Sequence, residues 1–278
     1  MNDDEARRDG SRYRVSDEER ARFRADGWVH LKGVVSPEEL AALDADYQRF
    51  VRREIAVAGK DFCDMSGDYD KPVESFAIIN VMLPRRYHPA WQGNVYERRA
   101  HSIAAQLCGP DLALDYDQLL AKRPRRPDAV FAWHQDLAYW PDDTPDTRTA
   151  TCWLALDDST PENGCMRFVS GTQKQPLRPH RPLHGDRSKS HTLVTDLAKG
   201  DRVSLARIAR GDITVHDERV LHGSGGNSSD GWRRAYIVAF RSAATVAEER
   251  RRGFTHSHND APQVLGQVGF ASTDRPGP

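Results

Sequence analysis

The hydrophobic pattern of the first sixty residues predicts two helices separated by a strand. Ser16 followed three residues later by Glu19 is a capping-box signature, and it predicts a short helix that ends near Gly27. Residues 28–35 have the composition and pattern of a strand. A serine, a proline and two acids then open a second helical pattern, which we expect to extend over residues 36–58.

Strand patterns dominate the rest of the chain. Residues 76–83 are apolar and strand-like, residues 94–108 have a helical pattern, and residues 112–122 alternate so that one face is mostly apolar. Further short strands, each followed by turn residues, are predicted at 149–156, 166–169, 201–205, 213–216 and 233–240. Short strands after a helical first third predict a mainly β fold with flanking helices (α+β), built on a β-sandwich or jelly roll.

These patterns predict a single domain over residues 15–247, with the jelly-roll core beginning at about residue 112. Residues 1–14 are polar and rich in Arg and Asp, which predicts a disordered N-terminal arm. From residue 248 onward charge, Gly and Pro rise again, and we expect residues 248–278 to form a loosely held C-terminal tail.

Composition narrows the class of protein. The 278 residues include 40 Lys and Arg against 41 Asp and Glu, a net charge of −1, which supports neither a nucleic acid nor an anionic membrane as a partner. No apolar run approaches the ~20 residues of a membrane helix. The charged N-terminus lacks the apolar segment of a secretory signal, and the four cysteines form no CxxC pair. Reduced thiols in a cytoplasmic protein are therefore expected, and no heptad run indicates an oligomeric state.

The segment Trp-His-Gln-Asp-Leu-Ala-Tyr-Trp holds the strongest candidate for chemistry. His134 and Asp136 are two residues apart, so in an extended strand both side chains leave the same face. An imidazole and a carboxylate make two thirds of the 2-His-1-carboxylate triad, which holds one face of Fe(II) and leaves the other open. Aromatic residues that would wall such a site are Phe131, Trp133, Tyr139 and Trp140. Because a His-x-Asp pair also arises by chance, this hypothesis requires a third ligand.

His222 is the candidate third ligand, since it lies at a strand end before a glycine-rich stretch that lets the backbone approach a metal. Arg233 follows eleven residues later, early in the next strand. If the two strands pair as a hairpin, Arg233 returns near His222 and offers a planar fork suited to a carboxylate. His216, six residues before His222, is the alternative ligand.

Simpler interpretations apply to the other polar residues. The histidines of the loop 175–192 are expected to be ordinary loop residues, and those of the tail are expected to be exposed: His180, His184, His191, His256 and His258. Arg234 should point to the opposite face of its strand from Arg233, as a surface or salt-bridge residue. Residues 123–127 are expected to form a solvated turn, with an anionic substrate group as the alternative use of their arginines.

Taken in order, these motifs resemble the phytanoyl-CoA dioxygenase family of Fe(II)/2-oxoglutarate-dependent oxygenases. The resemblance rests on His-Gln-Asp at 134–136, Asn-Gly-Cys-Met at 163–166, His-Gly-Ser-Gly at 222–225 and Arg233 eleven residues after His222. It implies a double-stranded β-helix, a cupin-like jelly roll. It also implies Fe(II), 2-oxoglutarate and O2 as cofactor and co-substrates, with ascorbate as an activator.

The resemblance also assigns roles to individual residues. His134, Asp136 and His222 match the iron ligands, and Arg233 with Ser224 matches the site for the distal carboxylate of 2-oxoglutarate. Further co-substrate contacts are expected from Gln118, Lys122 and Trp153, and substrate-facing positions from Phe131, Tyr139 and Trp140. Relatives that halogenate have a small residue at the carboxylate position, so Asp136 implies hydroxylation rather than halogenation.

The substrate is expected to be a small organic molecule. High Arg and Ala content with abundant Asp and Gly indicates a GC-rich bacterial source, which favours a tailoring step on a specialised metabolite, by analogy alone. An acyl-CoA or amino-acid hydroxylase of the same family and a non-catalytic jelly-roll binding module are the alternatives. The loops 59–72 and 175–192 are the segments expected to decide specificity if they close over the metal.

Overall fold

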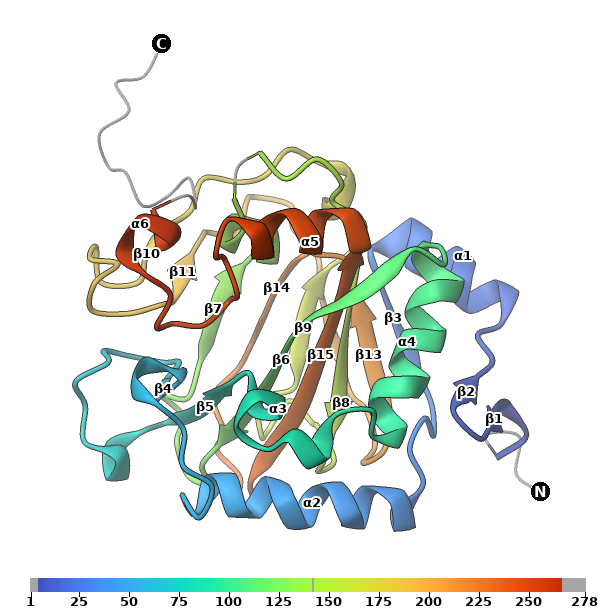
Figure 1. The fold of residues 1–278 in the computed structure, drawn as a ribbon, viewed down its shortest axis with the longest axis horizontal. Coiled ribbons are helices and arrows are strands. Elements are labelled where there is room, and N and C mark those ends of the chain that lie inside the picture. The colour runs from blue at the N-terminus through green and yellow to red at the C-terminus, as the bar shows by residue number, and fades with distance from the viewer. Residues whose placement is uncertain (1–4, 142, 267–278) are drawn as a thin grey trace.

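Two antiparallel sheets form the body of the protein in a computed structural model that describes residues 5–141 and 143–266 (Figure 1). The larger sheet has the strand order β3-β13-β8-β15-β6-β5-β4. Its strands are β3 (Trp28–Leu31), β4 (Phe62–Asp64), β5 (Ile78–Met82), β6 (Leu112–Lys122), β8 (Thr149–Ala155), β13 (Ile213–His216) and β15 (Arg233–Ser242). The smaller sheet, β12-β9-β14-β7, contains β7 (Phe131–His134), β9 (Met166–Val169), β12 (Val203–Ala206) and β14 (Leu221–Ser224).

Helices cover the outer face of the larger sheet (Figure 1). The α-helices are α1 (Asp17–Asp26), α2 (Pro37–Val51), α3 (Pro84–Tyr87), α4 (Val95–Cys108), α5 (Ala243–Arg251) and α6 (Pro262–Leu265). Leu40 and Phe50 of α2 and Ile103 of α4 are buried in one apolar cluster with strand residues such as Leu154. A second cluster joins the two sheets through Trp153 and Phe168. The jelly-roll prediction is confirmed, with apolar layers inside and outside the larger sheet.

Local signals predicted the ends of several elements correctly. The predicted capping box at Ser16 forms, and a second one forms at Ser36; each serine accepts the backbone N–H three residues later. The strands β6, β9 and β13 have the predicted bounds. The second helix ends earlier than predicted, at Val51, because Arg53 adopts a left-handed conformation (φ 62°) that turns the chain. No glycine or proline marks that turn.

The remaining structure consists of short elements, most of which the hydrophobic pattern missed. The short strands are β1 (Arg8–Asp9), β2 (Arg12–Tyr13), β10 (Arg181–Pro182) and β11 (Leu193–Val194). The 3-10 turns are η1 (Glu5–Arg7), η2 (Gly59–Asp61), η3 (Val73–Ser75), η4 (Pro89–Trp91), η5 (Asp136–Tyr139) and η6 (Thr172–Lys174). Runs of two to four residues are too short to show a period.

The N-terminal arm is not disordered over its described part. β1 and β2 pair as a small hairpin, and Tyr13 is buried with its hydroxyl donating to Lys32 O at 2.7 Å. In the sequence Tyr13 stands among charged residues, so the hydrophobic pattern does not identify it as the side chain that anchors the arm. The prediction for residues 1–4 lies outside the described residues.

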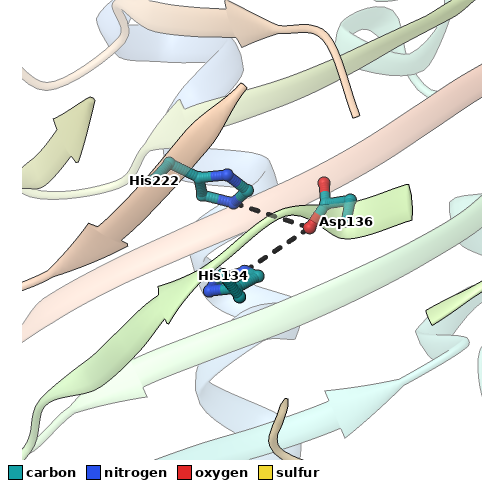
Figure 2. A group of neighbouring side chains, drawn as sticks. All are labelled: His134, Asp136 and His222. Atoms are coloured by element: carbon teal, nitrogen blue, oxygen red, sulfur yellow. Dashed lines mark ion pairs between the residues drawn. The ribbon is translucent and has the colours of Figure 1, made fainter. Parts of the chain in front are cut away.

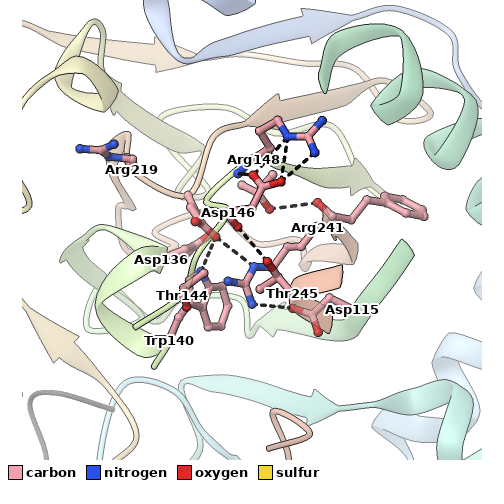
Figure 3. Close-up of polar contacts among 12 residues, drawn as sticks. Asp115, Asp136, Trp140, Thr144, Asp146, Arg148, Arg219, Arg241 and Thr245 are labelled. Carbon is pink, nitrogen blue, oxygen red and sulfur yellow. Dashed lines mark hydrogen bonds and ion pairs between the residues drawn. The ribbon is translucent and has the colours of Figure 1, made fainter. Parts of the chain in front are cut away.

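The prediction that the histidines of the C-terminal segment are exposed is wrong. His256 and His258 are buried rather than exposed. His256 Nε2 lies 2.8 Å from Asp115 Oδ2, and Asp61 Oδ1 accepts the His258 backbone N–H at 2.7 Å. Figure 3 shows Arg241 reaching Asp115 in the same buried network. Carboxylates from distant strands and turns pair with the basic residues that made this segment resemble a solvated tail. The rest of the predicted tail, residues 267–278, lies outside the described part.

Candidate active site

Three buried side chains from two neighbouring strands converge at the open end of the smaller sheet. His134 ends β7, Asp136 follows it at the start of a 3-10 turn, and His222 lies on β14, which pairs directly with β7 at these two histidines. Figure 2 shows both imidazoles directed at the carboxylate: His134 Nε2 and His222 Nε2 lie 3.4 and 3.5 Å from Asp136 Oδ1. One atom from each residue lies within 4.8 Å of the others. The three predicted ligands therefore form a facial set that could hold a metal ion.

Backbone carbonyls fix both histidines in the form that a metal requires. His134 Nδ1 lies 2.7 Å from Ala132 O, and His222 Nδ1 lies 3.0 Å from Val220 O. Each Nδ1 therefore carries the proton and donates it, which leaves the Nε2 lone pair directed into the site. Burial and the neighbouring His134 lower the pKa of His222 well below its usual value, so its imidazole stays neutral.

His216 is a neighbour of the carboxylate rather than a third ligand. Its Nε2 lies 3.3 Å from Asp136 Oδ2, on the opposite oxygen from the two ligand histidines. Within the described part of the chain its Nδ1 has no hydrogen-bond partner, so Nε2 carries the proton and donates. The sequence presented His216 as a competitor of His222; the structure makes it a positioning residue for Asp136.

We expect His216→Ala to weaken iron binding by roughly 10- to 100-fold, the usual effect of removing a partner that orients a metal ligand. His216→Gln should restore most of the loss, because its amide can still donate to Asp136. Anaerobic competition with a coloured Fe(II) chelator measures both affinities. Equal affinity in the wild type and His216→Ala would contradict this role.

His180 holds the short segment between the first two candidate ligands. Its Nε2 accepts the backbone N–H of Gln135 at 3.0 Å, while its Nδ1 donates to Arg178 O at 2.7 Å. Both bonds together require a neutral ring. Burial lowers the pKa of His180 to about 4, although the bond to Arg178 acts in the opposite direction. This loop histidine is thus a structural residue, as expected, and it fixes the backbone next to His134.

The depressed pKa of His180 predicts a stability that falls in acid. Below pH 6.5 the unfolded chain binds a proton that the folded chain refuses down to about pH 4, so the free energy of unfolding decreases as the pH falls through this window, by at most about 1.4 kcal/mol per pH unit. His180→Gln keeps an acceptor for Gln135 and removes this titration. Urea unfolding at pH 7 and pH 5 should show a smaller acid loss in His180→Gln, whereas the exposed-loop control His184→Gln should behave as the wild type. An unchanged acid loss in His180→Gln would contradict the prediction.

A second group of buried side chains, which are hydrogen-bond donors, lies beside the three candidate metal ligands and has no carboxylate to pair with. Arg233 Nη2 donates to Ser224 Oγ at 3.3 Å, and Lys122 Nζ lies 2.7 Å from the same oxygen. The Arg233 guanidinium stacks over the Trp153 ring at 5.1 Å. Neither Lys122 nor Arg233 has an ion-pair partner among the described residues, and Arg233 Nε, Arg233 Nη1 and Trp153 Nε1 are buried there without a hydrogen-bond partner. Such orphaned donors fit an anion.

The route by which Arg233 reaches this place differs from the predicted hairpin. β14 pairs with β7 and β9 in the smaller sheet, whereas β15 pairs with β6 and β8 in the larger one. Ser224 and Arg233 therefore meet across the two sheets. Lys122 is the direct partner of Arg233 in the β6–β15 ladder, which places both cations together. Arg234 points the other way and pairs with Asp157, as expected.

A largely apolar pocket opens onto the three candidate metal ligands. Phe131, Tyr139 and Trp140 all line it, as predicted, and the Phe131 and His134 rings lie 4.5 Å apart. Gln118 also lines the pocket, with its amide donating to Asn80 Oδ1 at 2.7 Å. Asp136 is the only carboxylate of the described residues in this lining. The cavity therefore favours apolar, neutral or anionic groups over cations.

Both loops that the sequence nominated as covers contribute to the pocket and are tied to each other. Met65 of the first loop and Arg187 and His191 of the second line the cavity. Thr192, the last residue of the second loop, donates its hydroxyl to Met65 O of the first loop at 2.8 Å.

Sequence reasoning did not assign two further residues of the pocket wall and one residue that contacts the wall without lining the pocket. His256 and His258 complete the wall from the C-terminal segment. Glu218, whose pKa is raised well above its usual value by burial, accepts the Trp140 indole N–H and thereby fixes that ring. These residues are identified only by their contacts in the folded protein, because no local sequence motif marks them.

The fold and the site together define a class: a jelly-roll metal oxygenase with a 2-His-1-carboxylate triad and an adjacent anion site. The phytanoyl-CoA dioxygenase (PhyH) family model matches residues 23–235. The chain belongs to this family, and it is an Fe(II)/2-oxoglutarate-dependent oxygenase.

Individual relatives agree with this assignment. The ectoine dioxygenase of Stutzerimonas stutzeri (strain A1501) is 26% identical over 219 residues, 74% of this chain and 70% of that protein. EvdO2 from Micromonospora carbonacea var. aurantiaca, solved with 2-oxoglutarate, has a TM-score of 0.66 and 28% identity over 83% of this chain and 92% of its own. The epimerase SnoN, solved with Fe3+, alpha ketoglutarate and nogalamycin RO, has a TM-score of 0.62 and 26% identity, covering 82% and 83% of the two chains.

The sequence holds no apolar run long enough to predict a membrane helix. Among the described residues, no helix combines the length and the apolar character that crossing a membrane requires.

Proposed function

We propose that the chain hydroxylates an unactivated C–H bond of a small organic substrate, as a tailoring step on a specialised metabolite. His134, Asp136 and His222 would hold Fe(II), and Arg233, Ser224, Lys122 and Trp153 would hold the distal carboxylate of 2-oxoglutarate. The observation that carries this proposal is the buried, unpaired donor set of Arg233 and Trp153 beside a facial triad. Both groups fit the residues present, because a neutral imidazole pair with a carboxylate suits iron and an orphaned guanidinium suits a carboxylate.

The residues of the chain supply geometry and exclusion of water. When bound, Fe(II) and 2-oxoglutarate supply the oxidation: O2 is consumed, 2-oxoglutarate becomes succinate and CO2, and the substrate gains a hydroxyl group. His134, Asp136 and His222 would supply three ligands to Fe(II), fewer than the metal accepts, so that the co-substrates could also bind. Phe131 and Tyr139 shield the site from solvent, while His216 and the two backbone carbonyls keep the ligands oriented.

The type of reaction and of substrate rests on two arguments. Asp136 occupies the carboxylate position, which favours hydroxylation over halogenation. The likeness to SnoN, solved with nogalamycin RO, and the apolar lining of the cavity support a specialised metabolite. An acyl-CoA or amino-acid hydroxylase is the alternative within the family, and the ectoine dioxygenase relative favours the amino-acid form.

Succinate formation from 2-oxoglutarate under air, with Fe(II) and with ascorbate as activator, tests the reaction without knowledge of the substrate. We expect iron-dependent succinate at a slow, uncoupled rate, which a matching metabolite then stimulates with formation of a hydroxylated product. Should succinate be absent, an anaerobic titration of 2-oxoglutarate into the Fe(II) protein decides, since binding produces a visible chelate band. Absence of the band as well would favour a non-catalytic binding module.

A further inference from the structure

Arg187 is the only cation in the pocket lining apart from the histidines, within the part of the chain that the structure describes. It lies on the loop 175–192, in the part between β10 and β11, and is only partly exposed. Its Nη1 donates to His191 O at 2.7 Å, which fixes the guanidinium against the wall. No described Asp or Glu lies within ion-pair distance of it, although the other arginines of this loop, Arg178 and Arg181, each pair with an aspartate. Arg187 therefore has donors to spare and no counter-charge.

The Tyr139 ring contacts both this guanidinium and the ring of the candidate ligand His134. Arg187 Cζ lies 5.6 Å from the centre of the Tyr139 ring, and that ring stands 5.8 Å from the ring of His134. Tyr139 also stacks on His191 at 5.1 Å, and His191 stacks on His258 at 3.8 Å. The charge is thus one aromatic ring away from a candidate iron ligand.

We propose that Arg187 and the stacked rings of Tyr139, His191 and His258 form a substrate subsite that binds an oxyanion, such as a carboxylate or an ionised phenol, attached to a planar or cyclic framework. This inference rests on the proposed function, because it describes the substrate of that same site. All three rings line the pocket and offer apolar contact surface to a flat framework, and the guanidinium offers a charge-assisted fork. A free amine finds no partner here, because Asp136 is the only carboxylate in the described lining and belongs to the triad.

The charge state of the two histidines agrees with this assignment. Burial lowers the pKa of His258 to about 3 and that of His191 well below its usual value. Both rings are therefore neutral near pH 7, so the positive charge of the subsite comes from Arg187. A bound anion is held by one guanidinium rather than by a cluster of cations.

The test uses a matched pair of probes, 2-naphthoate and 2-naphthamide, which differ in charge but not in framework. Binding is measured by naphthalene fluorescence anisotropy with the protein saturated with Fe(II) and 2-oxoglutarate under nitrogen, so that Arg233 is already occupied. We expect the wild type to prefer the acid, and Arg187→Gln to bind the acid roughly 10- to 100-fold more weakly with little change for the amide. Arg187→Lys should fall between them. Arg181→Gln, on the same loop but exposed and paired with Asp196, is the control and should match the wild type.

Each outcome decides the proposal. A wild type with no preference for the acid, including one that binds neither probe, overturns it, and so does an Arg187→Gln variant that keeps the preference. Circular dichroism and thermal unfolding of each variant separate lost contacts from lost folding. The measurement is repeated with the Arg233→Gln variant in the absence of 2-oxoglutarate. If 2-oxoglutarate fails to bind the protein, that result counts against the proposed function, whereas this repeat still measures the preference for the acid at Arg187.

Discussion

His134→Ala should reduce iron-dependent succinate formation to the level measured without added iron. The substitution removes one of the two imidazoles of the triad, and the remaining His222 and Asp136 offer too few ligands to hold Fe(II) on one face. Succinate release and Fe(II) affinity, measured side by side, should fall together.

A matched histidine substitution controls this experiment. His184→Ala removes an imidazole that is half exposed on the pocket-side loop and whose nearest carboxylate, Asp68, is 3.8 Å away. It should bind iron and form succinate as the wild type does. If His134→Ala retained iron-dependent turnover, the triad would have to be sought elsewhere. The other buried cluster with suitable side chains, Asp115, Glu249 and His256, is already neutralised by Arg241.

Arg233→Gln should weaken the binding of 2-oxoglutarate by roughly 100-fold while iron affinity changes little. Removing one partner of a buried charge pair costs far more than removing an exposed one, and Arg233 is among the most deeply buried side chains of the protein. Lys122 and Ser224 remain and keep part of the affinity. Anaerobic titration of 2-oxoglutarate into the Fe(II) protein, followed through the chelate band, gives the dissociation constant.

The next residue in the chain provides the control for this loss. Arg234→Gln removes the same charge from the opposite face of β15, where Arg234 pairs with Asp157 at 2.7 Å and with Asp44. It should lower stability and leave 2-oxoglutarate affinity unchanged. Equal effects of the two substitutions on affinity would show that Arg233 acts through the net charge of the protein and not as a binding residue.

The amino-acid sequence by itself predicted the fold class and the three candidate metal ligands that the structure brings together. Alternation along residues 112–122 and 213–216 predicted two strands to the residue, because side chains along a strand alternate between its two faces, although most positions of both strands are buried. The capping box at Ser16 and the cap at Ser36 predicted helix starts, because such serines satisfy backbone N–H groups within a few residues of themselves. His-Gln-Asp and His-Gly-Ser-Gly were readable for the same reason: each motif is local.

Only the tertiary structure decided what depends on contacts between distant segments. The meeting of Arg233 with Ser224 follows from two sheets that close on each other, and a hairpin within one sheet does not produce it. The sequence already favoured His222 over His216 as a ligand, but the contact of His216 with Asp136 became visible only in the fold. The C-terminal histidines looked like part of a solvated tail because their neighbours are charged, but those charges are neutralised by carboxylates such as Asp115, more than a hundred residues earlier. A periodic pattern reports which face of an element is buried, whereas the identity of the partner across that face is set by how the elements pack.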